Sequence, residues 1–261
     1  PRYAEVIGPD HAYGKGPWSR VRGLGEILGE MPTATLSDEI LLEGEGQIKA
    51  LICLGGNPVV AFPDQDKTIR AMQKLDLLVC VDLYRSATAK LADYIIAPTL
   101  SLERDDVTML TDTWYDEPYC HYTKAVLPKN PESLEEWEVY WELSHRTGIA
   151  LELPGGDLDP SKRPSKFDVL ALLMPDSRIP IKEIAAIGQG HIFDAVQVTV
   201  DPPRAGQQDR FQLLPTDIAA QLKTLAAETY WQQQGNVDDG VTYSHLLISR
   251  RLKHVYNSSG Q

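Results

Sequence analysis

The chain has 261 residues, of which 43% are hydrophobic and 24% are charged. This length and composition are ordinary for a soluble globular protein with a buried core and one large or two small domains. The formal net charge of −12 argues against nucleic acid as a partner, because phosphate neutralisation needs clustered lysine and arginine. The acidity itself is explained by solubility.

Targeting signals and cysteine pairs are both absent from the sequence. There is no signal peptide and no apolar run long enough to span a bilayer, so we expect no membrane segment and a cytoplasmic location, with the periplasm as the alternative.

No C-x-x-C motif occurs, which argues against a zinc or iron–sulfur site in this stretch. Cys53 and Cys80 lie in apolar runs and are expected to be buried. Cys120, beside His121, is the one candidate for a reactive thiol; with no second cysteine nearby, we assign no metal ligand.

The stretch that organises the chain is an apolar run that ends in glycines. Residues 48–54 read I-K-A-L-I-C-L and are followed by Gly55, Gly56, Asn57 and Pro58. Such a run, stopped by turn residues, is typical of a strand buried on both faces of a parallel sheet. The glycines permit positive φ and the close approach of a ligand, and Pro58 is expected to hold the Asn57 side chain out on a loop. Open α/β sheets bind ligands at this carboxyl edge.

The following segments alternate between helical and strand patterns. A helix is predicted over Asp64–Leu75, a second buried strand over Leu77–Val81, a helix over Ser86–Leu91 and a third strand over residues 94–97. Strand, helix, strand, helix, strand with short connections predicts right-handed βαβ units. The expected fold class is therefore α/β, with a Rossmann-like parallel sheet flanked by helices.

Shorter elements are predicted on both sides of this sheet. Residues 1–46 are irregular apart from a helix over Thr35–Leu42, and residues 153–165 form a loop that suits a domain boundary. A strong helix over Leu134–Arg146 is expected to end at Gly148. The remaining predictions are helices near 167–174 and 180–187, a strand over 196–200, a helix over 217–229 and a strand over 244–249.

The candidate ligand site combines the glycine turn with residues that follow the second strand. Asp82 ends that strand, and a carboxylate in this position can accept hydrogen bonds from a ribose or a base. Arg85 and the hydroxyls of Ser86 and Thr88, at the start of the predicted helix, suit phosphate. The pattern is neither G-x-G-x-x-G nor a phosphate loop, so a plain turn after a buried strand is the alternative.

Catalytic motifs are absent, and one basic cluster stands near the end of the chain. There is no G-x-S-x-G and no H-E-x-x-H, and the acids Glu103, Asp105 and Asp106 are expected to form ion pairs in a solvated loop. We therefore assign no catalytic residue. The segment S-R-R-L-K-H-V-Y-N-S-S at residues 249–259 suggests an anionic ligand, with a solvated cationic terminus as the alternative.

Together these motifs resemble the molybdopterin-guanine-dinucleotide oxidoreductases, the group of dimethyl sulfoxide reductase, formate dehydrogenase and nitrate reductase. The resemblance rests on L-I-C-L-G-G-N-P-V-V, on the segment from D-L-L-V-C-V-D to L-E-R-D-D, on E-W-E-V-Y-W-E-L-S-H-R-T-G and on L-L-I-S-R-R-L-K-H-V-Y-N-S. Thr88 and Ala89 match the end of the family's T-E-T-A, whereas Ser86 and Ala87 depart from its start. Further matches are Ala92 and Asp93 for A-D, Pro98 for the proline and Glu103 for the acid.

The resemblance implies a cofactor and its contacts. Two groups of residues would bind a molybdopterin guanine dinucleotide carrying Mo or W. Gly56, Asn57, Asp82 and Thr88, with Gly55, Arg85 and Ser86 nearby, would face one guanine dinucleotide arm. A second group, Ser249, Arg250, Arg251, His254 and Asn257, would approach a pterin or its phosphates.

The resemblance also implies a domain plan. Residues 1–46 are an N-terminal segment, 47–153 a Rossmann-like cofactor-binding domain and 154–205 a helical extension. Residues 206–261 are a linker helix and the first strand of a β-barrel-type molybdopterin-dinucleotide-binding domain. The family's cysteine cluster motif and metal ligand are not in this stretch. We therefore expect an internal piece of a longer enzyme, inactive alone, with any 4Fe–4S cluster in a preceding part.

The implied function is that of a bis-molybdopterin oxidoreductase, which performs two-electron redox or oxygen-atom transfer chemistry and has an electron-transfer subunit as partner. These residues would bind, orient and electrostatically tune the cofactor. The alternative is a non-catalytic nucleotide-binding or scaffold module of the same fold. A flavodoxin-like FMN protein is a weaker option, because no loop rich in serine and threonine follows the first strand.

Overall fold

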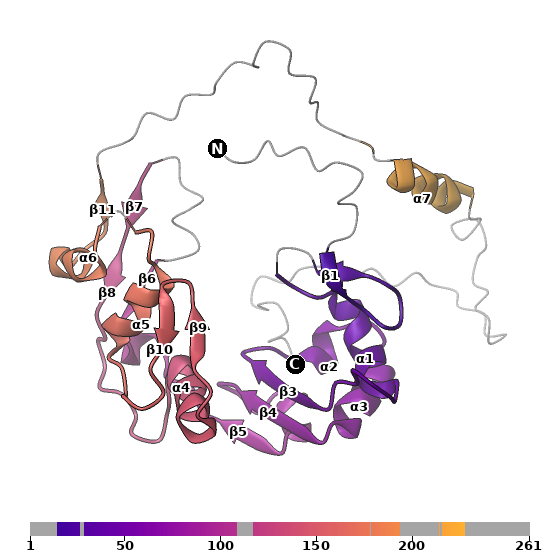
Figure 1. The fold of residues 1–261 in the computed structure, drawn as a ribbon, viewed down its shortest axis with the longest axis horizontal. Coiled ribbons are helices and arrows are strands. Elements are labelled where there is room, and N and C mark those ends of the chain that lie inside the picture. Colours follow the sequence, from indigo (N-terminus) through magenta and orange to yellow (C-terminus); the bar gives the residue numbers. More distant parts are fainter. Residues whose placement is uncertain are drawn as a thin grey trace, which may run out of the picture. The chain divides into compact units, whose positions relative to one another are not determined.

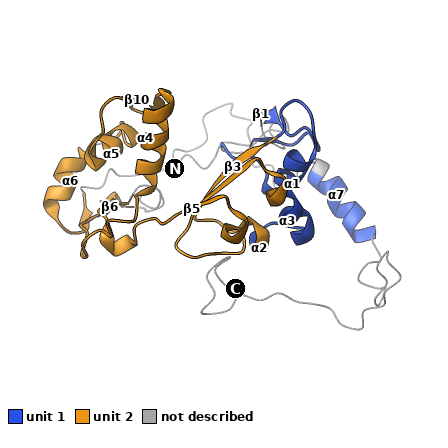
Figure 2. Cartoon of the chain, turned by 90° about the horizontal axis from the view of Figure 1, so that it is seen from below, with its two compact units in different colours: residues 1–47, 61–71, 198–261 blue, residues 48–60, 72–197 orange. Residues whose placement is uncertain are grey.

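The structure is a computed structural model that describes residues 15–26, 29–108, 117–177, 179–193, 214 and 216–227. The chain divides into two compact units, coloured separately in Figure 2. Unit 1 comprises residues 1–47, 61–71 and 198–261, and unit 2 comprises residues 48–60 and 72–197. The predicted domain boundaries stay a prediction.

Unit 1 contains a short hairpin joined to a helix by a buried carboxylate. Glu39 is 7% exposed and accepts hydrogen bonds from the Ser19 hydroxyl at 2.8 Å and from the Arg20 Nε at 2.7 Å. Burial acts to raise the pKa of Glu39, but the hydrogen bonds from Arg20 and Ser19 outweigh it, and the pKa is lowered. The elements of unit 1 are β1 (Lys15–Trp18), β2 (Gly25–Glu26), α1 (Thr33–Leu41), most of α3 (Gln65–Lys74) and α7 (Thr216–Ala227).

Helices α1 and α3 are tied together inside unit 1 by polar side chains. The hydroxyls of Ser37 and Thr68 are 3.1 Å apart and both residues are buried. Lys67 forms an ion pair with Asp38 beside them. A buried hydroxyl pair of this kind satisfies both groups and fixes how the two helices face each other.

Unit 2 begins with three parallel strands that lie side by side in the order β3-β4-β5 (Figure 1). These are β3 (Ala50–Leu54), β4 (Leu77–Val81) and β5 (Tyr94–Ile96). Their connections contain the one-turn helix α2 (Pro58–Ala61), α3 and the 3-10 helix η2 (Ala89–Leu91). The predicted parallel sheet with helices in its connections is therefore confirmed.

The expectation that β3 is buried on both faces is wrong. Ile52 is 38% exposed and Leu54 is 47% exposed, whereas Cys53, which points to the other face, is 7% exposed. Strand residues alternate between faces, and Ile52 and Leu54 share theirs with the exposed Leu77 and Tyr94 by register. Cys53, Leu78 and Cys80 on the other face are buried. On the face of Ile52 and Leu54, Val81 at the end of β4 is buried as well, at 2% exposed.

The remainder of unit 2 is a compact arrangement of short strand pairs and helices. Strand β6 pairs with β8, β7 with β11 and β9 with β10, all antiparallel. The last pair falls in the region predicted to be a loop. The elements are η3 (Ser101–Glu103), β6 (Asp106–Val107), β7 (Tyr119–Cys120), β8 (Tyr122–Thr123), α4 (Glu136–Thr147), β9 (Leu151–Leu153), β10 (Gly156–Leu158), α5 (Lys166–Leu173), α6 (Ile181–Ile187) and β11 (His191–Ile192).

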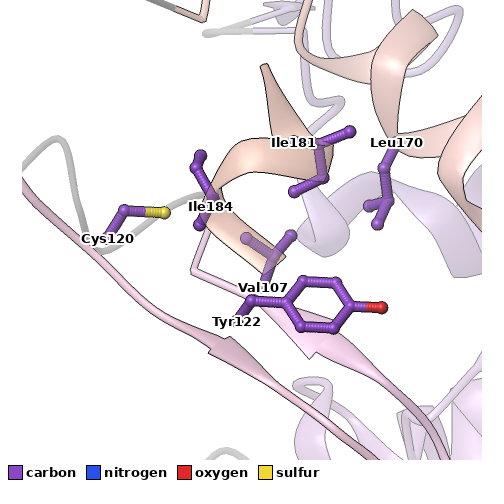
Figure 3. Close-up of a cluster of buried hydrophobic side chains, with 6 residues drawn as sticks. All are labelled: Val107, Cys120, Tyr122, Leu170, Ile181 and Ile184. Carbon is purple, nitrogen blue, oxygen red and sulfur yellow. The ribbon is translucent and has the colours of Figure 1, made fainter. Parts of the chain in front are cut away.

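A hydrophobic core joins these strands to α5 and α6. The ring of Tyr122 stacks on that of Phe167 with centroids 5.6 Å apart, and its hydroxyl donates to Asp105 at 2.6 Å. Burial and this bond to an acidic neighbour raise the pKa of Tyr122, so the phenol stays a donor. Figure 3 shows the buried cluster of Val107, Cys120, Tyr122, Leu170, Ile181 and Ile184.

Helix α4 ends where the sequence predicts and is held by one buried carboxylate. Gly148 takes φ +72° and donates to the Ser144 carbonyl at 2.8 Å, a left-handed cap that glycine tolerates without strain. Glu138 is 5% exposed and accepts from the Glu135 amide at 2.7 Å, from Lys129 and from Arg163. Burial acts to raise the pKa of Glu138, but these donors outweigh it and lower the pKa.

Replacing Glu138 by glutamine is expected to destabilise the chain by about 2 kcal/mol at pH 7. This is less than the cost of breaking a fully buried pair, because the two cations can reach water. A lowered carboxyl pKa gives stability that is complete above the unfolded value of about 4.3 and is lost as pH falls through the folded value. The deficit of the variant, measured by urea unfolding, should therefore shrink below pH 4. Glu132→Gln, at an exposed position, is the control, and equal stability of the two variants would contradict the prediction.

Candidate functional site

The ends of β3 and β4 bring two predicted groups to the same edge of the sheet. Leu54 and Val81 are paired as the last residues of their parallel strands. The Gly55 amide donates to the Val81 carbonyl at 2.9 Å, and the Asp82 amide donates to the Ile96 carbonyl at 3.2 Å. The glycine turn and the carboxylate therefore leave the sheet next to each other.

The glycine turn keeps its backbone open to approach. Gly55 has φ +60°, a conformation that side-chain-bearing residues rarely adopt. Apart from its two chain neighbours, no described residue has an atom within 4 Å of the position that a Cβ would take. A Cβ on Gly56 would instead lie 3.4 Å from the Cys53 Sγ. Glycine is therefore required at Gly55 for its backbone conformation, whereas the contact at Gly56 is an ordinary van der Waals distance.

The sequence predicts that the Asn57 side chain projects into solvent, and this is wrong. Asn57 is buried, with an exposed fraction of 5%. Its Oδ1 accepts hydrogen bonds from the Thr88 amide at 3.2 Å and from the Thr88 hydroxyl at 2.9 Å. The same hydroxyl oxygen accepts from the Val59 amide at 3.1 Å. These bonds connect the loop after β3 to the loop after β4. The side-chain orientation depends on a partner 31 residues away, which no local pattern reveals.

The predicted helix over Ser86–Leu91 is only the 3-10 turn of η2. Ser86 is 6% exposed, and its hydroxyl accepts from the Ala89 amide at 3.2 Å. Thr88 is fully buried and bonded as described. Serine and threonine side chains that bond nearby backbone compete with regular helix. Both hydroxyls thus hold the loop in shape, whereas the sequence suggested that they face an anion.

Asp82 and Arg85 are the predicted polar side chains that reach solvent here. Asp82 is half-buried, and its Oδ1 accepts from the Tyr84 amide at 3.1 Å. Arg85 is exposed. A carboxylate and a guanidinium beside an open glycine turn offer an acceptor for ribose or base donors and a donor for phosphate.

Two thiols lie directly beneath the turn. Cys53 and Cys80 are register partners on β3 and β4, and both are free and buried. The Cys53 Sγ donates to the Gly56 carbonyl at 3.2 Å. Burial raises the pKa of the Cys53 thiol and raises that of Cys80 to about 12. Both remain thiols at neutral pH, as expected for structural cysteines.

The other predicted groups are either structural or outside the described residues. Arg104 bonds Glu136 at 3.0 Å and lies 3.4 Å from Asp106, so the expected ion pair within this acidic loop is confirmed for Asp106. Glu103 and Asp105 instead accept hydrogen bonds from the Leu100 amide and the Tyr122 hydroxyl. Cys120 is buried in the core, beside the Thr108 hydroxyl. The five tail residues Ser249, Arg250, Arg251, His254 and Asn257 lie outside the described residues.

The described part of the chain offers neither a metal site nor a membrane-spanning helix. No three histidine, cysteine or acidic side chains are grouped so that they could hold a metal ion. In the same ranges, each helix is too short or too polar to cross a lipid bilayer. The candidate chemistry of the described residues is therefore that of the sheet edge.

The chain is α/β, and an open glycine turn and a carboxylate stand next to each other at the carboxyl edge of its parallel sheet, the edge at which open α/β sheets bind ligands. Residues 16–146, just over half of the chain, match the family described as molybdopterin oxidoreductase. The chain belongs to this family. The match includes the whole β3-β4-β5 sheet and its loops.

Several named oxidoreductases are similar to part of this chain. The chain is 30% identical over 129 residues to a trimethylamine-N-oxide reductase of Haemophilus influenzae, a match that covers 45% of this chain and 15% of the relative. It is 34% identical over 110 residues to the alpha subunit of an F420-dependent formate dehydrogenase of Methanocaldococcus jannaschii, covering 42% and 16%.

The chain thus matches only about a sixth of the length of these relatives. Among solved structures, acetylene hydratase from Pelobacter acetylenicus is similar with a TM-score of 0.48 and 21% identity, covering 61% of this chain and 20% of that one.

Removing either partner of the Asn57–Thr88 contact is expected to destabilise the chain. Asn57→Ala removes the oxygen that accepts from the buried Thr88 amide, and Thr88→Val removes the hydroxyl that accepts from the Val59 amide. Each should cost about 2 kcal/mol in urea unfolding. The double variant should lose about 1 kcal/mol less than the sum, because the two side chains share one interaction. The exposed Thr123→Val is the control; strict additivity of the two single variants would refute the coupling.

Proposed function

We propose that this chain is the guanine-dinucleotide-binding part of a molybdenum or tungsten bis-molybdopterin oxidoreductase. The observation that carries the proposal is the meeting of Gly55, Gly56 and Asp82 at one sheet edge, in a chain of the molybdopterin oxidoreductase family. The activity of the longer protein belongs to the proposal as well, since the relatives extend far beyond the matched region.

The residues at this edge fit a nucleotide in charge and shape. In the described part of the chain, no residue beyond the two chain neighbours of Gly55 comes within 4 Å of its Cβ position, which lets a phosphate or sugar approach the backbone. The Asp82 carboxylate would accept hydrogen bonds from the ribose hydroxyls or from guanine NH groups, and the Arg85 guanidinium would pair with the diphosphate.

The other predicted residues would support these contacts by holding the loops of Gly55, Asp82 and Arg85 in shape. The Asn57 side chain accepts from the Thr88 amide and hydroxyl. We therefore assign both residues to shaping the loops of the site and not to contact with the ligand. Ser86 holds the loop of Arg85 through its bond to Ala89. The tail residues of the predicted second group remain assigned to the pterin or its phosphates as part of the proposal.

The bound cofactor would supply two-electron redox or oxygen-atom transfer at its metal. The contribution of this chain would be to bind and orient the guanine nucleotide arm and to set the charge around it. Asp82 adds a negative charge near the base, and Arg85 offsets the charge of the phosphates. On this proposal the predicted plan, with a following barrel-type domain and an electron-transfer subunit, applies to the longer protein.

Isothermal titration of the chain with GDP tests the proposal. We expect binding that weakens about 10-fold in Asp82→Asn, because a bond to a charged acceptor is worth about 1.5–3 kcal/mol. Arg85→Ala should weaken the binding of GDP more than the binding of guanosine, since only GDP carries the diphosphate.

Asp76→Asn is the matched control, because Asp76 is exposed at the opposite, amino-terminal end of β4. It should leave the affinity unchanged. Tighter binding of NAD than of GDP by the unmodified chain, or an equal effect of the Asp76 and Asp82 variants, would reject a guanine dinucleotide site at this edge.

A further inference from the structure

The loop after β4 presents an aromatic ring that the proposed contacts leave unused. Tyr84 is 74% exposed, more than any other large hydrophobic side chain in the described part of the chain. A single exposed hydrophobic residue is ordinary on a protein surface. Here Leu54, Val60 and Leu83 are also exposed, at 47%, 41% and 54%, and all follow or end the strands at the same carboxyl edge.

The backbone on both sides of Tyr84 is fixed, although its ring is free. The Tyr84 amide donates to Asp82 at 3.1 Å, and its carbonyl accepts from the Ser86 amide at 2.8 Å. Ser86 is buried and bonded to Ala89, and Thr88 is anchored to Asn57. The loop is thus held at its start by the carboxylate and at its end by buried hydroxyls. The ring stands on a rigid support, so ordering it against a ligand costs little entropy.

We propose that Tyr84 is a base-binding residue on whose ring the purine of the nucleotide stacks. This inference rests on the proposed function and names the group that holds the base. Tyrosine offers a flat apolar face, and stacking on it suits any planar heterocycle. Tyr84 lies two residues after Asp82, so a base on its ring would have its edge within reach of that carboxylate. Stacking would then provide affinity and Asp82 would provide the choice of base.

The test measures GDP and ADP affinity in Tyr84→Ala and Tyr84→Phe. Tyr84→Ala should weaken both nucleotides by about 10-fold or more, the size of one base–aromatic stack. Tyr84→Phe should keep wild-type affinity, because the ring face is retained. The NMR signal of the GDP base proton H8 should shift upfield on binding to the wild-type chain, and this ring-current shift should vanish in Tyr84→Ala.

Tyr94→Ala is the matched control. Tyr94 is 66% exposed, but it begins β5 and pairs in register with Val79, the middle residue of β4, so it lies away from the loop that carries Tyr84. Because both tyrosines are exposed, neither alanine variant should change the urea unfolding midpoint by more than the control Thr123→Val does.

The outcomes separate the two proposals. If the wild-type chain binds no GDP, the proposed function fails and the stacking role fails with it. If GDP binds but Tyr84→Ala behaves like Tyr94→Ala, the stacking role alone is wrong. Equal losses in Tyr84→Ala and Tyr84→Phe would also overturn stacking, because they would assign the effect to the hydroxyl.

Discussion

The candidate site depends on the buried contact between Asn57 and Thr88. Two side chains from loops 31 residues apart bond each other and accept from two backbone amides, those of Thr88 and Val59. A buried amide or hydroxyl without a partner is costly, so the two loops have few alternative arrangements. This constraint places the glycine turn beside Asp82 and leaves the solvent-facing groups of the loops available for a ligand.

The residues of these two loops therefore have two separate roles, one structural and one in contact with solvent. Asn57, Ser86 and Thr88 point inward and define the loops, whereas Asp82, Tyr84 and Arg85 point outward. Below them, the protonated thiols of Cys53 and Cys80 fill the covered face of the sheet as small apolar groups. The buried side chains fix the loop backbone that carries the exposed side chains, in the way that supporting residues orient the groups that contact a ligand.

The sequence predicted the backbone better than the direction of the side chains. β4 has the predicted bounds because L-L-V-C-V is a continuous apolar run between two aspartates, and α4 ends at Gly148 because glycine accepts the left-handed cap. Asn57 was misplaced because its partner is remote. The helix expected at Ser86 is reduced to one turn by local bonds from its hydroxyls. The exposed face of β3 depends on which other segments cover it, and the strand pattern carries no information about them.

The exposed sheet face has a consequence for handling the chain in solution. Ile52 and Leu54 on β3, Leu77 on β4 and Tyr94 on β5 present apolar surface on one face of the sheet, and apolar surface drives self-association. The net charge of −12 opposes this through mutual repulsion between molecules. Salt screens such repulsion over about 8 Å at physiological strength, so dilute buffer should keep the molecules apart whereas concentrated sulfate should bring these faces into contact.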